Sequence, residues 1–243
     1  MAKIIVFSDM HGNLAALQAA WTDIQERPRD RVYCLGDLAA FGPEPEETLR
    51  YVREVIQPDV TLLGNTDRYL LQVLDGAEAG AWTHDEGAAA AIRWGAARLS
   101  AESVAWLRTL PGSFQEVLDG TSVELVHAAP GDDERGVGPI STREDLEGLF
   151  GQQGPGLTFC GHTHVPFRVQ VGERLVVNVG SVGLPFDGDF RACYVRGKVA
   201  EGHLHDFENR RVPYSMARTL DAIAREGLPD AARYGRRLRF SER

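Results

Sequence analysis

The sequence predicts an α/β protein, and three observations support that class. Short apolar runs alternate with amphipathic segments as far as Asn65, which is the pattern of a parallel sheet covered by helices. The second half of the chain is rich in strand-forming runs, which predict a second sheet. Of the 243 residues, 43% are hydrophobic, which is enough for one large domain with a full core.

The first half is predicted to alternate strands and helices. Lys3 to Phe7 is an apolar, β-branched run without alternation, which indicates a buried strand. A helix is expected from Asn13 to about Glu26, because its apolar residues recur on one face. Arg31 to Leu35 and Asp59 to Leu63 are two further predicted strands. Pro43 to Val55, between them, is a predicted helix with acidic residues in its first turn.

The chain becomes Ala-rich from Gly76 to about Leu110, which predicts helices. One helix is expected from about His84 to Leu99, and a second, capped by Ser100, through about Leu107. We interpret this stretch as a helical insertion beside the site, within a single domain of residues 1–243.

The second half of the chain predicts mainly strands, at Ser113–Leu118, Ser122–His127, Leu157–Cys160, Phe167–Val171, Arg174–Asn178, Arg191–Arg196 and Lys198–Phe207. The last four are expected in a second sheet. Short helices are predicted at Thr142–Gly151 and Ser215–Glu226. The tail from Arg233, which carries four further arginines, is expected to be frayed.

Composition limits the function and the compartment. The formal net charge of −9 suits a nucleic-acid clamp poorly, so no stable nucleic-acid binding is expected; a nucleotide substrate stays open, because metal ions supply positive charge locally. Cys34, Cys160 and Cys193 lie in apolar runs and are expected to be buried free thiols. No apolar run approaches the roughly 20 residues of a membrane helix, and no signal peptide is recognisable. We therefore expect a cytoplasmic protein without membrane contact.

Seven potential metal ligands stand at the ends of predicted strands, where open α/β sheets usually bind their ligands. They are Asp9, His11, Asp37, Asn65, His127, His162 and His164. No block is specific alone, because Gly-Asp and Gly-Asn mark turns in many proteins. Together, seven groups are too many for one ion and suit two ions that share a ligand. A two-metal site stabilises both the attacking and the leaving oxygen in displacement at phosphorus, so phosphoester hydrolysis is predicted.

The blocks resemble the calcineurin-like metallophosphoesterase superfamily, and most closely its small bacterial phosphodiesterase-like branch. The resemblance rests on Asp9-Met10-His11-Gly12-Asn13, Gly36-Asp37, Gly64-Asn65-Thr66-Asp67, His127 and Gly161-His162-Thr163-His164. Asn178-Val179-Gly180-Ser181 also resembles the family's Asn-Pro-Gly-Ser run, with Val179 where Pro is usual. The resemblance implies a four-layer αββα sandwich of two mixed sheets flanked by helices.

The resemblance also implies a role for each ligand. One ion would be held by Asp9, His11, Asp37 and His164, and the other by Asp37, Asn65, His127 and His162. Asp37 would bridge the two ions, and Asp37, Asn65 and His127 would be the catalytic centre. Mixed nitrogen and oxygen ligation suits Mn, Fe, Zn or Ni ions. A bridging hydroxide, its pKa lowered by two cations, would attack phosphorus in line.

Thr66 is where this sequence departs from the family pattern. Many relatives carry a His there that assists the leaving group; a threonine hydroxyl has no useful acid pKa, and general acid help is typically worth about 10²–10⁴-fold. The Leu38–Phe41 loop also lacks the Arg of the protein phosphatases. Arg68, Thr66 and His84 are weak candidates for contacting substrate, and Arg68 is equally consistent with a surface charge at a helix start.

A phosphodiesterase that acts on small phosphodiesters is the leading hypothesis. A phosphomonoesterase, a protein phosphatase, a dinucleoside polyphosphate hydrolase and an inactive metal-binding scaffold are the alternatives. The loop from Pro130 to Gly138 and the helical insertion are expected to shape substrate access. The acidic residues Asp132, Asp133 and Glu134 of that loop would repel polyanions, which favours a small phosphoester as the partner. The oligomeric state is left open.

Overall fold

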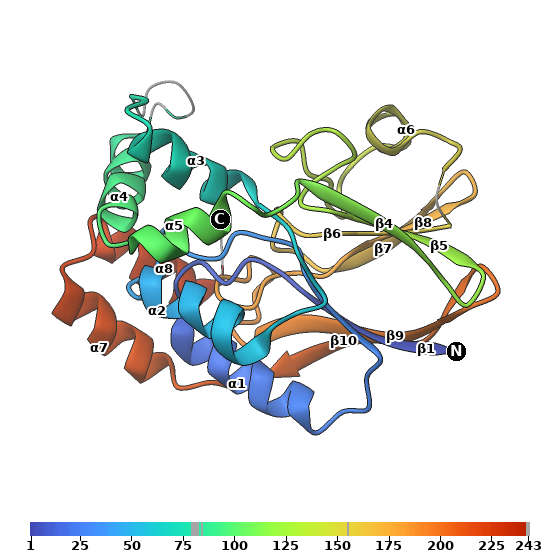
Figure 1. Cartoon of the computed structure of the whole chain (residues 1–243), viewed down its shortest axis with the longest axis horizontal. Coiled ribbons are helices and arrows are strands. Elements are labelled where there is room, and N and C mark those ends of the chain that lie inside the picture. Colours follow the sequence, from blue (N-terminus) through green and yellow to red (C-terminus); the bar gives the residue numbers. More distant parts are fainter. Residues whose placement is uncertain (79–82, 84, 155, 242–243) are drawn as a thin grey trace.

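The computed structural model describes residues 1–78, 83, 85–154 and 156–241 (Figure 1). The first of its two sheets has the strand order β10-β9-β1-β2-β3. Its members are β1 (Ala2–Phe7), β2 (Arg31–Cys34), β3 (Val60–Thr61), β9 (Ala192–Ala200) and β10 (His203–Val212). The three N-terminal strands are parallel, whereas β9 runs antiparallel to both β1 and β10. This sheet is therefore mixed.

The second sheet has the order β4-β5-β6-β8-β7. Its members are β4 (Ser113–Leu118), β5 (Thr121–Val126), β6 (Leu157–Cys160), β7 (Phe167–Val171) and β8 (Arg174–Asn178). The central strands β5, β6 and β8 are parallel, and the edge strands β4 and β7 pair antiparallel to them. This sheet is mixed as well.

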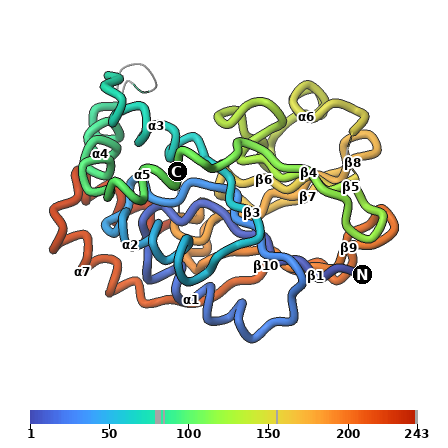
Figure 2. Tube along the Cα trace, in the orientation of Figure 1, coloured from blue at the N-terminus to red at the C-terminus, as the bar shows by residue number. Residues whose placement is uncertain are grey.

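The two sheets pack face to face across a buried core to which β1 contributes Ile4 and Val6, and β6 contributes Phe159. Helix α1 (Leu14–Gln25), helix α2 (Pro45–Arg50) and the π-helical turn η1 (Tyr51–Ile56) cover the outer face of the first sheet. Helix α6 (Arg143–Phe150) covers the second sheet (Figure 2). The predicted αββα sandwich of two mixed sheets is thereby confirmed.

The remaining helices gather at one end of the sandwich, at the left of Figure 1. They are α3 (Asn65–Leu74), α4 (Glu86–Ala96), α5 (Ala101–Leu107), α7 (Met216–Glu226) and α8 (Ala231–Phe240). Strand β1 runs from the N-terminus towards this end (Figure 1), so the loops that follow the parallel strands open beneath these helices. Within the described residues, no helix has both the length and the apolar character needed to cross a bilayer.

The last two predicted strands, Arg191–Arg196 and Lys198–Phe207, were wrong in their boundary and in their sheet. The chain continues straight through Gly197, which lies inside β9, and a Cβ there would lie 2.7 Å from Leu204 Cδ1 of the paired strand β10. The reversal comes later, at Glu201 and Gly202, where both φ angles are positive, as in a type I′ hairpin turn. Both strands belong to the first sheet, because β9 pairs with β1.

The tail from Arg233 was expected to be frayed, and it forms helix α8 instead. Tyr234 and Leu238 are buried in a cluster with Leu184 and Ile223, which supplies the packing that stabilises a short helix. Helix α3, which begins at Asn65 after a short connection from β3, is a further element whose extent the sequence did not predict. Strand β3 is only two residues long, shorter than the predicted Asp59–Leu63. All three cysteines are free and buried, as predicted.

Candidate metal centre

All seven predicted ligands lie where the carboxyl ends of the two sheets meet. Backbone hydrogen bonds tie their loops together: Asp9 N–H donates to the Gly36 carbonyl at 3.0 Å, and His11 N–H donates to the Asp37 carbonyl at 3.0 Å. Gly161 N–H donates to the His127 carbonyl at 2.8 Å, which joins the loops of the second sheet in the same way. Six of the seven side chains are buried, and His162 is partly exposed. The ligand loops are therefore fixed relative to one another before any ion binds.

Five of the seven residues have left-handed backbone conformations. The φ angles are 58° at Asp9, 46° at His11, 56° at Asp37, 65° at His162 and 60° at His164. Asp and His tolerate this region better than most residues, yet it costs about 1–2 kcal/mol for an L-residue. Such strain, concentrated in one place, is typical of functional sites. It marks this cluster independently of the residue types.

Three imidazoles are held in one tautomer by backbone carbonyl groups. The Nδ1 atoms of His11, His127 and His164 lie 3.1, 2.8 and 2.5 Å from the carbonyl oxygens of Ala40, Leu35 and Leu184. An Nδ1–H that donates to a carbonyl leaves the Nε2 lone pair free to bind a cation. The Nε2 atoms of all three residues therefore face the centre, where each can bind a cation once Nε2 carries no proton.

The two carboxylates each use one oxygen for the protein and direct the other at imidazoles. Asp9 Oδ2 accepts from His162 N–H at 3.1 Å, and Asp9 Oδ1 lies 3.2 Å from His164 Nε2. Asp37 Oδ2 lies 3.6 Å from His11 Nε2 and 3.4 Å from His127 Nε2. The oxygen of Asp37 is thus between two imidazoles from different sheets.

Asn65 lies beside His127 and His162 in the cluster. Its Oδ1 lies 3.0 Å from His127 Nε2 and 3.2 Å from His162 Nδ1. Asn65 is the first residue of α3, and Gly64 precedes it at the N-cap. The side-chain oxygen therefore reaches the cluster directly from a helix start.

The donor set fits divalent metal ions. The Nε2 atoms of His11 and His164 face each other at 3.0 Å, and Asp9 Oδ1 is buried without a hydrogen-bond partner. Atoms bound to one metal at about 2.1 Å are separated from each other by roughly 3.0–3.4 Å, which matches these spacings. Two groups of described residues could hold an ion: Asp9 with His11 and His164, and Asp9 with Asp37 and His127. These are the candidate metal-binding residues.

Electrostatics also favour cations in the cluster. Burial alone would raise the pKa of Asp37, but the His127 imidazole beside it holds that pKa below its usual value. Burial would likewise lower the pKa of His127, yet the Asp37 charge raises it to about 10. Burial and the neighbouring His127 lower the pKa of His162 to about 4. The carboxylates are thus held ionised, which favours positive charge beside them.

Glycines allow the ligand loops to touch. A Cβ on Gly64 would lie 2.2 Å from Asp37 Oδ1, and a Cβ on Gly161 would lie 2.4 Å from Asp9 Oδ2. Each glycine therefore packs directly against a carboxylate contributed by another loop. Gly64 and Gly161 are therefore needed for this close approach, because a side chain at either position would collide with the carboxylate.

The Asn178–Ser181 run supports the cluster from beneath. Asn178 Nδ2 donates to the Gly161 carbonyl at 2.6 Å and to Thr163 Oγ1 at 3.0 Å. Ser181 Oγ donates to the Asp9 carbonyl at 2.7 Å. These side chains hold the loops of two ligand blocks, and Val179 in place of the usual Pro leaves that arrangement intact.

A cavity of about 230 Å³ opens over the cluster. Its lining includes His11, Asp37, Asn65, His162 and His164, together with Thr66, whose Oγ1 is buried without a hydrogen-bond partner. Thr83 and Ala88 of the predicted insertion also line it. His84, a weak candidate for substrate contact, lies outside the described residues.

Arg68 is not among the residues that line this cavity. Its guanidinium donates to Asp133 at 2.7 and 2.8 Å and to Glu134 at 2.7 Å. Tyr69 O–H also donates to Glu134, at 2.7 Å. The acidic loop is therefore partly neutralised by α3, which reduces the repulsion expected from Asp132–Glu134.

The cavity also contains residues that the sequence did not identify. Phe41, Leu184, Phe186 and Arg237 line it, and the Phe186 ring stacks on the His164 imidazole at 4.4 Å between centroids. Phe41 is in the loop after Asp37, and Arg237 belongs to α8. The periodicity of Ala231, Tyr234 and Leu238 was the available signal for that helix.

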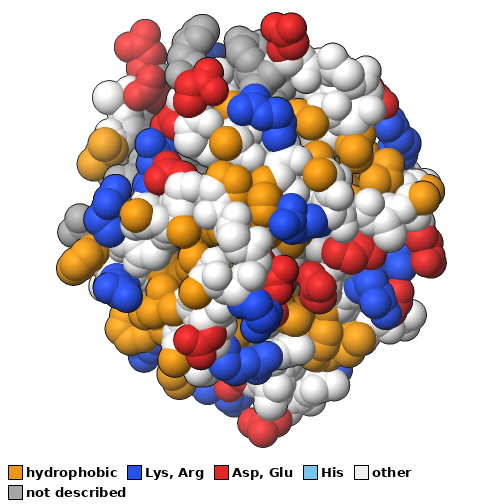
Figure 3. Space-filling model, turned by 90° about the vertical axis from the view of Figure 1, so that its left-hand side faces the viewer, with side chains coloured by type: hydrophobic (Ala, Val, Ile, Leu, Met, Phe, Trp, Pro, Cys, Tyr) orange, Lys and Arg blue, Asp and Glu red, His pale blue; other side chains and the backbone are white. Residues whose placement is uncertain are grey.

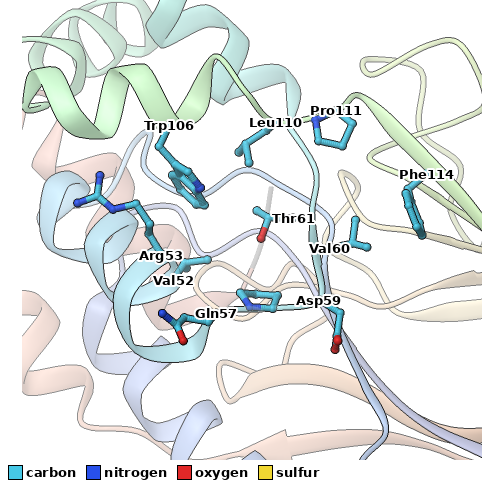
Figure 4. A pocket seen from close by; sticks show the side chains of 11 residues that line it. Val52, Arg53, Gln57, Asp59, Val60, Thr61, Trp106, Leu110, Pro111 and Phe114 are labelled. Carbon is cyan, nitrogen blue, oxygen red and sulfur yellow. The ribbon is translucent and has the colours of Figure 1, made fainter.

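A larger hollow of about 480 Å³ lies elsewhere, over the edge strand β3 (Figure 4). Trp106, Leu110 and Phe114 give it a mainly apolar wall, and Arg53 and Asp59 lie at its side (Figure 4). Neither candidate metal group of the described residues contributes to its lining. The chemistry of the protein is therefore assigned to the cavity over the ligand cluster.

A mixed αββα sandwich with a histidine- and carboxylate-rich cluster at the strand ends defines a class of metal-dependent phosphoesterases. The chain belongs to one family of this class, the calcineurin-like phosphoesterase superfamily, whose domain model matches residues 2–202.

Two relatives align with this chain over nearly their whole length, and a third aligns over part of it. An uncharacterized protein of Methanocaldococcus jannaschii is 28% identical over 94% of this chain and 95% of its own. A metallophosphoesterase from Sphaerobacter thermophilus has a crystal structure with a TM-score of 0.78 and 27% identity, covering 98% of each chain. A symmetrical bis(5′-nucleosyl)-tetraphosphatase of Aromatoleum aromaticum is 40% identical over 34% of this chain, which spans 29% of that relative.

Proposed function

We propose that the protein is a phosphodiesterase that hydrolyses small phosphodiesters with two divalent ions, Mn, Fe, Zn or Ni. The observation that carries this proposal is the position of Asp37 Oδ2, 3.6 Å from His11 Nε2 and 3.4 Å from His127 Nε2. An oxygen placed between two sets of ligands suits a carboxylate that bridges two ions. A two-metal site stabilises both the attacking and the leaving oxygen in an in-line displacement at phosphorus.

The ligand roles that we infer are those implied by the family resemblance, and the same proximities support them. Asp9, His11, Asp37 and His164 would hold one ion. Asp37, Asn65, His127 and His162 would hold the other. Bound ions of this kind supply a nucleophile from water at neutral pH and neutralise charge on phosphoryl oxygens.

The chain's own residues have three tasks in this reaction. The carbonyls of Ala40, Leu35 and Leu184 keep three imidazoles in the tautomer that can bind a cation. The buried carboxylates of Asp9 and Asp37 keep the cluster anionic, so that ions are retained. Phe41 and Phe186 line the cavity and limit access of water to the bound phosphoester.

The diester preference rests on Thr66. Thr66 lines the cavity beside Asn65, and its hydroxyl has no acidic pKa near neutrality, so a leaving group must depart without strong general acid help. Activated esters have such leaving groups, and we infer a diester among them because the phosphodiesterase-like branch that the sequence resembles often lacks the acid histidine. A second candidate activity is hydrolysis of dinucleoside polyphosphates, which the partial likeness to a bis(5′-nucleosyl)-tetraphosphatase favours.

The test is turnover of a phosphoester panel by metal-reconstituted protein. Mn²⁺-loaded protein should hydrolyse bis-p-nitrophenyl phosphate faster than p-nitrophenyl phosphate, and Asp37→Ala should lose at least a hundredfold in kcat/KM. His203→Ala, which removes an exposed histidine of β10, is the matched control and should retain activity. A loaded protein that is inert on every phosphoester, or a fully active Asp37→Ala variant, would overturn the proposal.

A further inference from the structure

The ring of His162 is held differently from the other imidazoles of the cluster. Its Nδ1 atom faces the cluster, 3.2 Å from Asn65 Oδ1, whereas the other three imidazoles face it with Nε2. Among the described residues, no backbone carbonyl contacts a ring nitrogen of His162, and this side chain is partly exposed. Contacts other than a hydrogen bond to the backbone must therefore orient this ring.

The loop of residues 132–137 packs against the His162 ring. A Cβ on Gly136 would lie 2.6 Å from His162 Cδ2, so the backbone of this glycine lies directly beside the imidazole. The next residue, Val137, is buried, and its carbonyl accepts a hydrogen bond from Thr163 Oγ1 at 3.1 Å. The loop therefore forms a wall beside His162 that is tied to the neighbouring residue of the same ligand block.

Arg68 fastens the other side of this loop to helix α3. Its guanidinium donates two hydrogen bonds to Asp133 and one to Glu134. Asp132 Oδ1 accepts from the N–H groups of Glu134 and Arg135 at 2.9 Å each, which keeps the turn compact. A bidentate pair of arginine and carboxylate fixes geometry as well as adding charge-assisted bonds. We call the hydrogen bonds of Arg68 to Asp133 and Glu134 the Arg68 clasp.

The clasp connects the segments that carry three ligands of one proposed ion. Asn65 is the first residue of α3, and Arg68 belongs to the same turn. His127 follows β5 and leads into the loop, and Gly136 of the loop lies against His162. The hydrogen bonds of the clasp do not reach the ligands that belong to the other ion alone, which are Asp9, His11 and His164.

We propose that Arg68 is a positioning residue for the ion that His162 would bind. The clasp holds the loop against the His162 ring and so sets the affinity of that one ion. This inference deepens the proposed function and rests on its two-ion arrangement. Side chains that orient a metal ligand without touching the metal typically change metal affinity by about 10- to 100-fold. The ion held by His164 should not depend on the clasp.

A purely electrostatic role for Arg68 predicts the opposite change in affinity. Loss of its positive charge would leave Asp133 and Glu134 uncompensated near the cluster, and they would strengthen the binding of cations. The face that Figure 3 shows mixes acidic and basic side chains without a broad patch of either sign, so no general field there masks a local change of charge. Weaker binding after loss of the guanidinium therefore distinguishes positioning from charge.

Arg68→Met removes the clasp and keeps an unbranched side chain. Zn²⁺ binding is followed by NMR of the histidine ring signals, with free Zn²⁺ set by a chelator, so that His162 reports one ion and His164 the other. The free Zn²⁺ that shifts half of the His162 signal should rise at least tenfold, and that for His164 should stay within twofold. Arg143→Met, which removes an exposed arginine paired with Glu147, is the control and should change neither.

The contact between the loop and the ring is also measured on the metal-free protein. The close approach of Gly136 to His162 Cδ2 predicts a nuclear Overhauser effect between Gly136 Hα and His162 Hδ2 in the wild type. This effect should fall at least twofold in Arg68→Met and should be unchanged in Arg143→Met. It requires neither bound metal nor catalytic activity.

Gly136→Ala tests the wall by a second route, which keeps the inference open to refutation if Arg68→Met does not fold. The added methyl group would lie 2.6 Å from His162 Cδ2 and 2.7 Å from Thr163 Cγ2, so the ring or the loop must move. Zn²⁺ binding reported by His162 should again weaken at least tenfold. Gly138→Ala adds a methyl group in open space and is the matched control.

Unchanged or tighter Zn²⁺ binding at His162, or an undiminished Overhauser effect, in Arg68→Met would overturn the proposal. Equal weakening at His162 and His164 would overturn it too, because the effect would then be a general loss of structure. A wild type whose His162 does not respond to Zn²⁺ would refute the ligand assignment and this inference with it. A wild type that binds Zn²⁺ at both histidines but hydrolyses no phosphoester would contradict only the proposed function.

Discussion

The backbone N–H of Thr66 donates a hydrogen bond to Asp37 Oδ1 at 2.9 Å. This bond occupies one oxygen of the carboxylate and leaves Oδ2 facing His11 and His127. The residue that replaces the family's histidine therefore still orients the proposed bridging ligand through its backbone. Its side chain, in contrast, carries a hydroxyl group and no acidic group.

Thr66→His is expected to restore general acid assistance without disturbing this backbone bond. The gain should be largest for esters with poor leaving groups, where such assistance is worth about 10²–10⁴-fold, and small for p-nitrophenyl esters. The measurement is kcat for phenyl and p-nitrophenyl phosphoesters. Thr66→Gln, of similar size but without an acidic proton, is the control, and an equal gain in that variant would contradict the explanation.

Asp67 positions two ligand loops from inside the protein. Its carboxylate is fully buried and accepts from Leu38 N–H at 2.9 Å and from Gly64 N–H at 3.2 Å. Asp67→Asn keeps one acceptor and loses the other, so one buried N–H is left without a partner at a cost of about 1–3 kcal/mol.

We expect Asp67→Asn to lower the melting temperature and to weaken Mn²⁺ binding by at least tenfold. Calorimetric titration of the metal and a thermal melt measure the two effects. Asp75→Asn, which removes an exposed carboxylate paired with Arg108, should change neither metal affinity nor activity. Unaltered metal binding in Asp67→Asn would show that the loops hold their positions without this carboxylate.

The raised pKa of His127 predicts that metal binding releases a proton. The Asp37 charge outweighs burial and raises the pKa of His127 to about 10, so the metal-free protein carries a proton on this imidazole at pH 8. A metal ligand must be deprotonated, so binding has to release that proton, and affinity should rise with pH up to about 10. Calorimetry in buffers of different ionisation enthalpy counts the protons. A count near zero at pH 8 would remove His127 from the ligand set.

Gly64→Ala tests the close packing of the ligand loops. The added Cβ would lie 2.2 Å from Asp37 Oδ1, so either α3 or Asp37 must move. Overpacking of this kind costs roughly 1–3 kcal/mol, and we expect kcat to fall at least tenfold. Gly112→Ala, which adds a methyl group in open space, is the matched control for the change of residue. Full activity in Gly64→Ala would mean that the carboxylate position is not critical.

Local sequence patterns predicted most strands and helices correctly. They failed where packing between distant parts of the chain determines the structure. The bounds of β4, β6, β7 and β8 agree with the sequence, because alternation and turns are local signals. The break predicted at Gly197 was wrong, because the strand continues through this glycine, which lies beside Leu204 of β10. Helix α8 was missed because it is rich in arginine and has only two buried residues, Tyr234 and Leu238. These two residues are buried against Leu184, which is distant in the sequence.

The ligand cluster was predictable for a different reason. Each of its members has a distinctive residue type within a few residues of the end of a strand, so position and chemistry coincide in the sequence. Arg237 has no such signal, because it reaches the cavity only after α8 packs beside Leu184. Arg68 illustrates the converse: its place next to Asn65–Asp67 suggested a phosphate contact, and its guanidinium pairs with a loop 65 residues away.

The central claim is a two-ion centre built on Asp37, and the metal content of reconstituted protein tests it most directly. Mn²⁺ per chain is measured by mass spectrometry after removal of loosely bound ions, for the wild type and for Asp37→Asn. The account predicts two ions in the wild type and loss of at least one in the variant. One ion or none in the wild type, or two in Asp37→Asn, would contradict it.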